Sequence, residues 1–144
     1  MMNTLIKPPC HIKFLGIREY SAIFQSMKEF TDTRTQNSHD QIWIVEHLPV
    51  YTTGGKNTQP FKENTLNSVP VVPNNRGGSI TYHGPGQWIF YLLLNLRHQS
   101  LNASKLVDQT EKLLISLLEK SNISSQANPS ARGIYVQDKK IASI

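Results

Sequence analysis

The chain has 144 residues, which is enough for one domain that buries ~70% of its unfolded surface. Hydrophobic residues make up 38% of it and charged residues 17%, which excludes the apolar-poor, charge-rich composition of a disordered protein. The net charge is +5, but the basic residues are scattered and form no stripe that could track phosphates, so we expect no nucleic-acid partner.

Three features of the sequence bear on its compartment. The longest clearly apolar run, residues 89–94, is far shorter than the ~20 residues of a membrane-spanning helix, so we expect no membrane association. The N-terminus holds no apolar stretch of signal-peptide length. The single cysteine, Cys10, excludes an internal disulfide and a cysteine zinc site. Together these features predict a cytoplasmic protein.

In the first half of the chain, strands are predicted at residues 11–16, 41–46 and 51–53. A helix is predicted at residues 19–34, because its apolar residues recur at helical spacing: Tyr20, Ile23, Phe24, Met27 and Phe30. Residues 56–68 hold few apolar side chains and indicate an extended loop. Proline at positions 70 and 73 restricts the next strand, at residues 69–72, to an edge or irregular strand.

The second half begins with a predicted strand at residues 79–82. A second strand, at residues 88–94, is continuously apolar and is expected to be buried on both faces. A helix is predicted at residues 102–120, with Asn102 or Ser104 as its cap and Asn122 as its stop. Its apolar stripe consists of Leu106, Thr110, Leu113, Leu114, Leu117 and Leu118. A β-hairpin follows, formed by residues 134–136 and 140–144.

The order of these elements indicates an α+β domain with a mixed or antiparallel sheet flanked by helices, and neither a repeat nor a linker divides residues 1–144. The sequence stops inside the predicted strand at residues 140–144, and domains seldom end on an uncovered apolar hairpin. We therefore expect a single but incomplete domain whose last strands are missing.

Several residues are expected to have structural roles. Trp43 and Trp88 lie in apolar strands and are predicted to be in the core. The pair Glu46-His47 precedes Pro49 at a strand end, where capping or packing is expected rather than catalysis. The five histidines show no ligand spacing such as His-Glu-x-x-His, so we expect no metal site.

Residues 76–87 differ in composition from the rest of the chain, with four Gly, one Pro, one Arg and one His. Glycine lets the backbone approach a ligand closely and present bare N–H groups. Arg76 could bind an anionic group or pin the loop to a carboxylate, and His83 could donate to a carbonyl or move a proton. The alternative is two tight turns around a structural histidine. The glycine spacing fits neither a Walker phosphate loop nor a dinucleotide fingerprint.

Three motifs follow one another along nearly the whole chain. The first occupies the glycine-rich segment: Arg76-Gly77-Gly78-x-x-Thr81-Tyr82-His83-Gly84-Pro85-Gly86-Gln87. The second is N-terminal to it: Gln25-Ser26-Met27-x-x-Phe30-Thr31-x-x-Arg34, then Trp43-x-x-Glu46-His47-x-Pro49-Val50-Tyr51-Thr52. The third is the C-terminal hairpin: Gly133-Ile134-Tyr135-Val136, then Lys140-Ile141-Ala142-Ser143-Ile144. In content and order these motifs resemble those of the lipoate-protein octanoyltransferases.

The resemblance implies the fold shared by class II aminoacyl-tRNA synthetases and the biotin and lipoate protein ligases. It implies transfer of an octanoyl group from octanoyl-acyl carrier protein to a lysine of lipoyl domains, in dehydrogenase complexes and in the glycine cleavage H protein. It implies no cofactor, a cysteine nucleophile that forms a thioester acyl-enzyme, and a lysine, matched here by Lys140, that lowers the pKa of that cysteine. The implied substrate-binding residues are Arg76, Gly77, Gly78, Ser79, Ile80, Thr81, Tyr82, His83, Ser143 and Ile144.

The family pattern continues beyond the lysine hairpin to a Pro-Cys-Gly that these 144 residues do not contain. Cys10 is not its match, because it follows Pro8-Pro9 and only Lys7 or Lys13 could lower the pKa of its thiol. We therefore expect Cys10 to be a bystander and this chain, as it stands, to have little or no transferase activity.

Two other functions remain open. An ATP-dependent ligase for lipoate or biotin would share the fold class, but it needs further residues for the adenylate phosphate. A non-catalytic remnant would hold acyl groups or carrier protein without turnover, which the missing cysteine favours. The role of Tyr82 is also open, since it could line an acyl tunnel or be a partly buried aromatic side chain.

Overall fold

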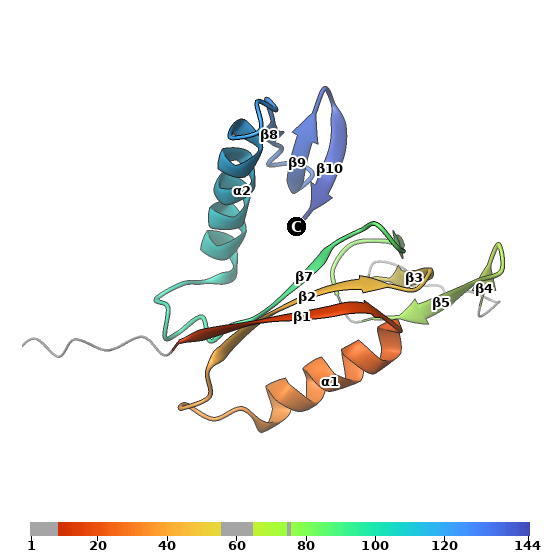
Figure 1. The fold of residues 1–144 in the computed structure, drawn as a ribbon, viewed down its shortest axis with the longest axis vertical. Coiled ribbons are helices and arrows are strands. Elements are labelled where there is room, and N and C mark those ends of the chain that lie inside the picture. Colours follow the sequence, from red (N-terminus) through yellow and green to blue (C-terminus); the bar gives the residue numbers. More distant parts are fainter. Residues whose placement is uncertain (1–8, 56–64, 75) are drawn as a thin grey trace, which may run out of the picture. The chain divides into compact units, whose positions relative to one another are not determined.

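The computed structural model describes residues 9–55, 65–74 and 76–144, and it divides the chain into two compact units, Met1–Leu94 and Asn95–Ile144 (Figure 1). Residues 56–64, which make up most of the predicted loop at 56–68, lie outside the described residues, as do Lys7 and Pro8.

The first unit contains a three-stranded mixed sheet of order β1-β2-β7. Strand β1 (Cys10–Arg18) runs parallel to β2 (Asp40–His47), and β7 (Ile89–Leu93) pairs antiparallel with β2. Helix α1 (Tyr20–Thr33) connects the two parallel strands, which cannot be joined by a tight turn (Figure 1). The carboxylate of Glu19 caps the helix by accepting hydrogen bonds from two backbone N–H groups of its first turn. The predicted helix and its two flanking strands are confirmed.

Helix α1 buries its apolar face on one side of this sheet. Ile23 of the helix and Trp43 and Val45 of β2 form the buried core, with 7%, 7% and 2% of their surfaces exposed. Partly buried apolar side chains pack around them: Leu15, Met27, Phe30, Ile89, Tyr91 and Leu93. Because each fully buried side chain of this size stabilises the fold by roughly 2 kcal/mol, this cluster is what holds α1 on the sheet. The prediction that Trp43 lies in the core is confirmed.

The opposite face of strand β7 stays exposed. Ile89, Tyr91 and Leu93 pack toward the core, whereas Phe90 is 52% exposed and Trp88, just before the strand, is 62% exposed. The predictions of a strand buried on both faces and of Trp88 in the core are therefore wrong. Side chains of a strand alternate between two faces, and α1 covers the face that Phe90 does not share.

A second sheet of the first unit has the order β4-β5-β3-β6. Strand β3 (Val50–Thr53) pairs in parallel with β5 (Val69–Pro73) and antiparallel with β6 (Thr81–His83). Strand β4 (Thr65–Leu66) pairs antiparallel with β5. The strand predicted at residues 51–53 is confirmed, whereas the one predicted to begin at residue 79 begins two residues later.

One expectation for this second sheet is wrong, whereas the expected edge or irregular strand at residues 69–72 is met by an irregular one. Residues 65–66, within the predicted loop, form strand β4, because Asn67 and Ser68 both have positive φ (50° and 63°) and fold the chain back on β5. Strand β5 lies between β4 and β3 in the sheet order. However, β4 pairs with its residues 69–70 and β3 with its residues 71–73, so each residue has one strand partner and the prolines are tolerated.

The second unit consists of helix α2 (Ala103–Glu119) and an antiparallel sheet of order β10-β9-β8. Strand β9 (Gly133–Val136) pairs with both β10 (Lys139–Ser143) and β8 (Gln126–Ala127). The predicted hairpin is confirmed, and its turn at residues 137–138 has φ values of 47° and 63°, the left-handed pair of a type I′ turn. Strand β8 was not predicted, because two residues are too few to show a period.

Helix α2 begins and ends as predicted. The side chain of Asn102 accepts a hydrogen bond from a backbone N–H of the first turn, and Asn122 adopts φ of 57° just beyond the helix. The predicted apolar stripe is only partly covered, since Leu113 is 69% and Leu117 58% exposed. The buried residue of this helix is instead a carboxylate, Glu111, which is 6% exposed.

Taken together, helices α1 and α2 and these mixed and antiparallel sheets make the α+β fold class that the sequence predicted. Neither helix in the described part of the chain is long and apolar enough to cross a membrane.

Candidate functional site

Arg76 ties the glycine-rich loop to strand β3. Its Nη2 atom donates to the carbonyls of Thr52 and Ser79 at 2.8 and 2.7 Å, and its Nη1 atom donates to the carbonyl of Gly77 at 2.9 Å. Nε and Nη2 also reach the hydroxyl of Thr52, which is fully buried, at 3.3 and 3.1 Å. The guanidinium therefore pins the loop through carbonyls and a hydroxyl, not through the carboxylate suggested above.

The loop backbone also packs directly against the Gly54-Gly55 segment that follows β3. The N–H of Gly55 donates to the carbonyl of Arg76 at 2.8 Å. A Cβ atom at Gly54 would lie 2.3 Å from the carbonyl oxygen of Gly78 and 2.7 Å from that of Gly77. Two stretches of backbone thus meet at a distance that only glycine at position 54 allows.

His83 stands at the end of β6 with both ring nitrogens close to polar partners. Its Nδ1 atom lies 2.8 Å from Gln87 Oε1, and its Nε2 atom lies 3.4 Å from the Thr52 hydroxyl. Burial lowers the pKa of the His83 imidazole, and the charge of Arg76 acts in the same direction, while the bond to Gln87 opposes them. The ring is therefore held mainly in its neutral form, which can both donate and accept a proton.

His47 connects this loop to the core of the first unit. It is fully buried, and its ring centroid lies 5.2 Å from that of Tyr20 and 6.1 Å from that of His83. Its ring nitrogens lie 3.1 Å from the Arg18 carbonyl and 2.8 Å from the Tyr91 hydroxyl. The expectation of a packing role for His47 agrees with these contacts, but its polar partners were not foreseen. They lie on two other strands, so no local pattern in the sequence could identify them.

The remaining loop residues differ in exposure. Gly77, Gly78 and Ser79 are exposed, and Gly78 adopts φ of 82°, which favours glycine. Thr81 is half-buried and pairs with Thr52 across the sheet.

Ile80 and Tyr82 flank Thr81 in this segment. Ile80 is half-buried. Tyr82 is 45% exposed, and its ring centroid lies 5.3 Å from that of Tyr51 in an edge-to-face arrangement.

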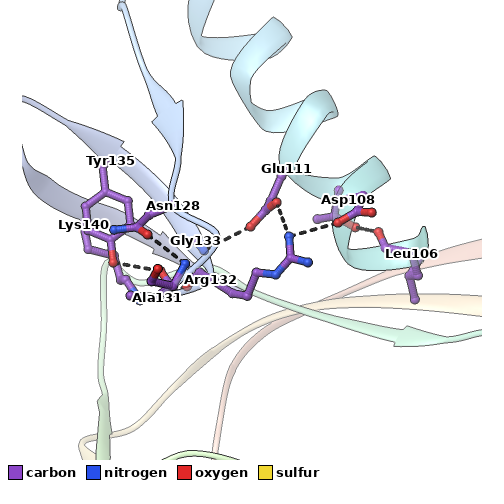
Figure 2. Close-up of polar contacts among 11 residues, drawn as sticks. Leu106, Asp108, Glu111, Asn128, Ala131, Arg132, Gly133, Tyr135 and Lys140 are labelled. Atoms are coloured by element: carbon purple, nitrogen blue, oxygen red, sulfur yellow. Dashed lines mark hydrogen bonds and ion pairs between the residues drawn. The ribbon is translucent and has the colours of Figure 1, made fainter. Parts of the chain in front are cut away.

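Lys140 belongs to the second unit, where strand β10 places it opposite Tyr135 of β9 (Figure 2). Its Nζ atom donates a hydrogen bond to the carbonyl of Arg132 at 2.9 Å and lies 5.3 Å from the centroid of the Tyr135 ring. Gly133 makes room for it, because a Cβ there would lie 3.2 Å from Lys140 Cε and 2.3 Å from the Ala142 carbonyl oxygen. The lysine is thus held by a carbonyl and an aromatic face.

Ser143 and Ile144 lie at the end of the same hairpin. Ser143 is exposed and pairs with Gly133, and Ile144 follows strand β10 with 41% of its surface exposed. Lys139 is likewise exposed, opposite Val136 at the turn. The loop residues 76–83 therefore gather in the first unit, and Lys140, Ser143 and Ile144 gather in the second.

Cys10 and the histidines add no further reactive cluster. Cys10 is an exposed thiol at the start of β1, and partial burial, followed by the charge of Asp40, raises its pKa. A raised pKa disfavours the reactive thiolate, in agreement with the expected bystander role. Among the residues that the structure describes, no group of three or more His, Cys, Asp or Glu could hold a metal ion.

Comparisons with known proteins relate both halves of the candidate site to one family. Residues 19–144 match the family model of the lipoyl protein ligase A/B catalytic domain. An octanoyltransferase of Vibrio vulnificus (strain YJ016) is 44% identical over 144 residues, which cover 100% of this chain and 63% of that protein. An octanoyltransferase of Legionella pneumophila (strain Lens) is 45% identical over 130 residues, which cover 90% of this chain and 65% of that protein. The chain thus spans less than two thirds of the length of these relatives.

Proposed function

The chain belongs to the lipoyl protein ligase A/B catalytic domain family, and on this premise we propose that the protein acts as an octanoyltransferase. The donor is octanoyl-acyl carrier protein, and the acceptor is a lysine of lipoyl domains in dehydrogenase complexes and in the glycine cleavage H protein. The relatives named octanoyltransferase, together with the loop and hairpin motifs, support this proposal. The reaction takes place in the cytoplasm and serves lipoate biosynthesis.

The two compact units are proposed to belong to one catalytic domain. The family match runs from residue 19 to residue 144 and therefore crosses the boundary at Leu94. One cooperative unfolding transition, seen alike by fluorescence and circular dichroism, is the expected result. Two separate transitions would contradict it.

The proposed chemistry consists of two acyl transfers. A cysteine thiolate attacks the thioester carbonyl of the donor, the bond from that carbonyl to the carrier sulfur breaks, and the carrier thiolate takes up a proton. The amine of the acceptor lysine then attacks the enzyme thioester, an amide forms, and the cysteine leaves as a thiolate. Lys140 gives up a proton in the first transfer and receives one in the second. The 144 residues do not contain the Pro-Cys-Gly in which the family resemblance places this cysteine.

The environment of the Lys140 ammonium carries the proposal. Its partners are the Arg132 carbonyl and the Tyr135 ring, both uncharged. Among the ion pairs of the described residues, none involves Lys140. An ammonium group that no carboxylate neutralises keeps its full charge for a neighbouring thiolate.

The glycine-rich loop would bind the acyl group in the same reaction. Arg76 fixes the loop backbone, and the exposed Gly77 and Gly78 leave their surface open to a ligand. Backbone without side chains can approach the acyl group closely. The neutral imidazole of His83 donates from Nδ1 to Gln87, so its Nε2 atom, beside the Thr52 hydroxyl, is left to accept a hydrogen bond.

The proposal is tested in a chimera in which these 144 residues replace the matching part of the Vibrio vulnificus octanoyltransferase. We expect octanoyl transfer from octanoyl-acyl carrier protein to a lipoyl domain, measured by intact-protein mass spectrometry. Lys140→Ala should lower kcat by roughly 10²–10⁴-fold, whereas the neighbouring Lys139→Ala should keep the parent rate. A chimera that binds octanoyl-acyl carrier protein without transfer would indicate a non-catalytic remnant. Lipoate attachment that requires ATP would indicate a ligase.

The 144-residue chain itself provides the matched comparison. Incubated with octanoyl-acyl carrier protein, it should form no thioester adduct, and Cys10→Ser should behave identically. An adduct on the parent but not on Cys10→Ser would contradict the bystander role of Cys10 and the expected inactivity.

A further inference from the structure

Glu111 is a buried carboxylate on a helix whose leucines are partly exposed. Its side chain is 8% exposed, and both oxygens are bonded. Oε2 accepts from Arg132 Nη1 at 2.9 Å, and Oε1 accepts from the backbone N–H of Gly133 at 3.3 Å (Figure 2). Burying a carboxylate is unfavourable unless such partners are present, so its place on the inner face of α2 is tied to these two residues.

One peptide group joins Glu111 to Lys140. The N–H of Gly133 and the C=O of Arg132 belong to the same planar unit, and in a trans peptide they point in opposite directions. Glu111 holds the N–H end at 3.3 Å, and Lys140 Nζ donates to the C=O end at 2.9 Å. A hydrogen bond at one end of a peptide polarises the other end, so the carboxylate strengthens the acceptor that holds the lysine.

The backbone around this peptide is specialised in two further ways. Gly133 adopts φ of 137°, and a Cβ at this position would lie 2.3 Å from the Ala142 carbonyl oxygen. The register of the hairpin shifts between Lys140 and Ala142, as in a β-bulge. Bulges re-aim a side chain relative to its strand. The hairpin is therefore built so that Lys140 meets the Arg132 carbonyl.

We propose that Glu111 is a positioning residue for Lys140, acting through the peptide group between Arg132 and Gly133. The proposal rests on the function assigned above to Lys140, and it names a residue of α2 on which the direction of that ammonium group depends. Arg132 takes part by neutralising the buried carboxylate, and Asp108, its second partner at 2.9 Å, lies outside the path to the peptide.

Competitive labelling of the 144-residue chain with a limiting amine-acetylating reagent tests the proposal without any activity. Lys139 on the same strand is the internal reference, because both lysines are exposed and opening of the whole hairpin would change the surroundings of both. In Glu111→Leu the ratio of Lys140 to Lys139 acetylation should rise by roughly 3-fold, since the polarised acceptor is lost. Glu111→Gln keeps an oxygen for the Gly133 N–H and should restore most of the parent ratio. Asp108→Asn, the matched control, should keep it.

An unchanged ratio in a Glu111→Leu sample that circular dichroism shows to be folded would overturn the proposal, and so would an equal rise in Asp108→Asn. If Glu111→Leu fails to fold, the same coupling can be measured from the lysine end. Lys140→Met, at an exposed site, should move the Gly133 amide proton upfield in ¹H–¹⁵N spectra, because the peptide loses its polarising cation. Lys139→Met should not. Identical Gly133 shifts in both variants would overturn the proposal as well.

Kinetic measurements on the chimera separate the positioning role of Glu111 from the proposed function. In the chimera, Glu111→Leu should lower kcat by about 10-fold with a smaller change in KM for octanoyl-acyl carrier protein, and Glu111→Gln should recover most of it. If the parent chimera transfers no octanoyl group, the proposed function fails while the labelling result still decides the positioning. If the chimera is active but labelling is insensitive to Glu111, the positioning role of Glu111 is rejected and the proposed function stands.

Discussion

The Nε2 atom of His47 lies 2.8 Å from the Tyr91 hydroxyl oxygen, so a side-chain bond joins strands β2 and β7 on the face that helix α1 covers. The Nδ1 atom lies 3.1 Å from the carbonyl oxygen of Arg18, at the end of β1. Because a carbonyl can only accept, Nδ1 carries the proton of the neutral ring and Nε2 accepts from Tyr91. One buried imidazole thus links the three strands of this sheet.

This arrangement predicts that stability falls in acid. Burial is the main cause that lowers the pKa of His47 below its usual 6.5, and burial also lowers that of His83. As the pH falls through 6.5, the unfolded chain therefore binds more protons than the folded chain, and the free energy of unfolding decreases. We expect a lower urea midpoint at about pH 5.5 than at about pH 7.5. His47→Gln should weaken this dependence, whereas His39→Gln, at an exposed position, should keep it. Equal dependence in both variants would contradict the prediction.

Removing the hydroxyl of Tyr91 tests the His47 bond directly. Tyr91→Phe keeps the ring but leaves the buried Nε2 of His47 without its donor, which should cost about 1–3 kcal/mol of unfolding free energy. Tyr82→Phe is the control, because that side chain is 45% exposed and its change should stay within about 0.5 kcal/mol. Both values come from urea unfolding followed by circular dichroism. A Tyr91→Phe change no larger than the control would mean that the bond contributes little.

The close approach of the glycine-rich loop to β3 gives a second pair of variants. A Cβ at Gly54 would lie 2.3 Å from the Gly78 carbonyl oxygen, whereas one at Gly77 would meet no atom within 4 Å among the described residues. Gly54→Ala should therefore destabilise the protein by about 1–3 kcal/mol, and Gly77→Ala should change little. Urea unfolding at neutral pH measures both. Equal effects would mean that the loop does not lie against Gly54 in solution.

Local sequence patterns predicted the elements whose apolar residues lie close together in the sequence. The helix at residues 19–34 carries a strong 3.6-residue pattern, and the strand at residues 41–46 is a short apolar run rich in β-branched residues. The C-terminal hairpin is two short apolar runs close together in the sequence. The two-residue strands β4 and β8 could not be found this way, because only their partners define them. The exposed face of β7 was missed because a continuous apolar run does not say which of its residues will be covered.

The candidate site, too, could be predicted only where the signal is local in the sequence. Composition alone singled out Arg76 and His83, since glycine, arginine and histidine are concentrated in that segment. The partners of Arg76 could not be predicted, because they are backbone carbonyls placed by the fold. Glu111 was also missed, although it lies at helical spacing from Leu114 and Leu118, which are half-buried. A carboxylate within such a face is a signal, but its partners lie 21 and 22 residues away in the sequence.

The exposed face of the first sheet makes a last prediction, because its two tryptophans differ sharply. Trp43 is 7% exposed within the core, and Trp88 is 62% exposed. Acrylamide should therefore quench mainly the emission of Trp88, and Trp88→Phe should remove most of the quenchable fluorescence. Trp43→Phe should leave it and should instead lower the free energy of unfolding by about 1–3 kcal/mol, because the smaller ring leaves a cavity beside Ile23. If Trp88→Phe leaves quenching unchanged, Trp88 is covered in solution. The prediction that this face of the sheet is exposed to solvent would then be wrong.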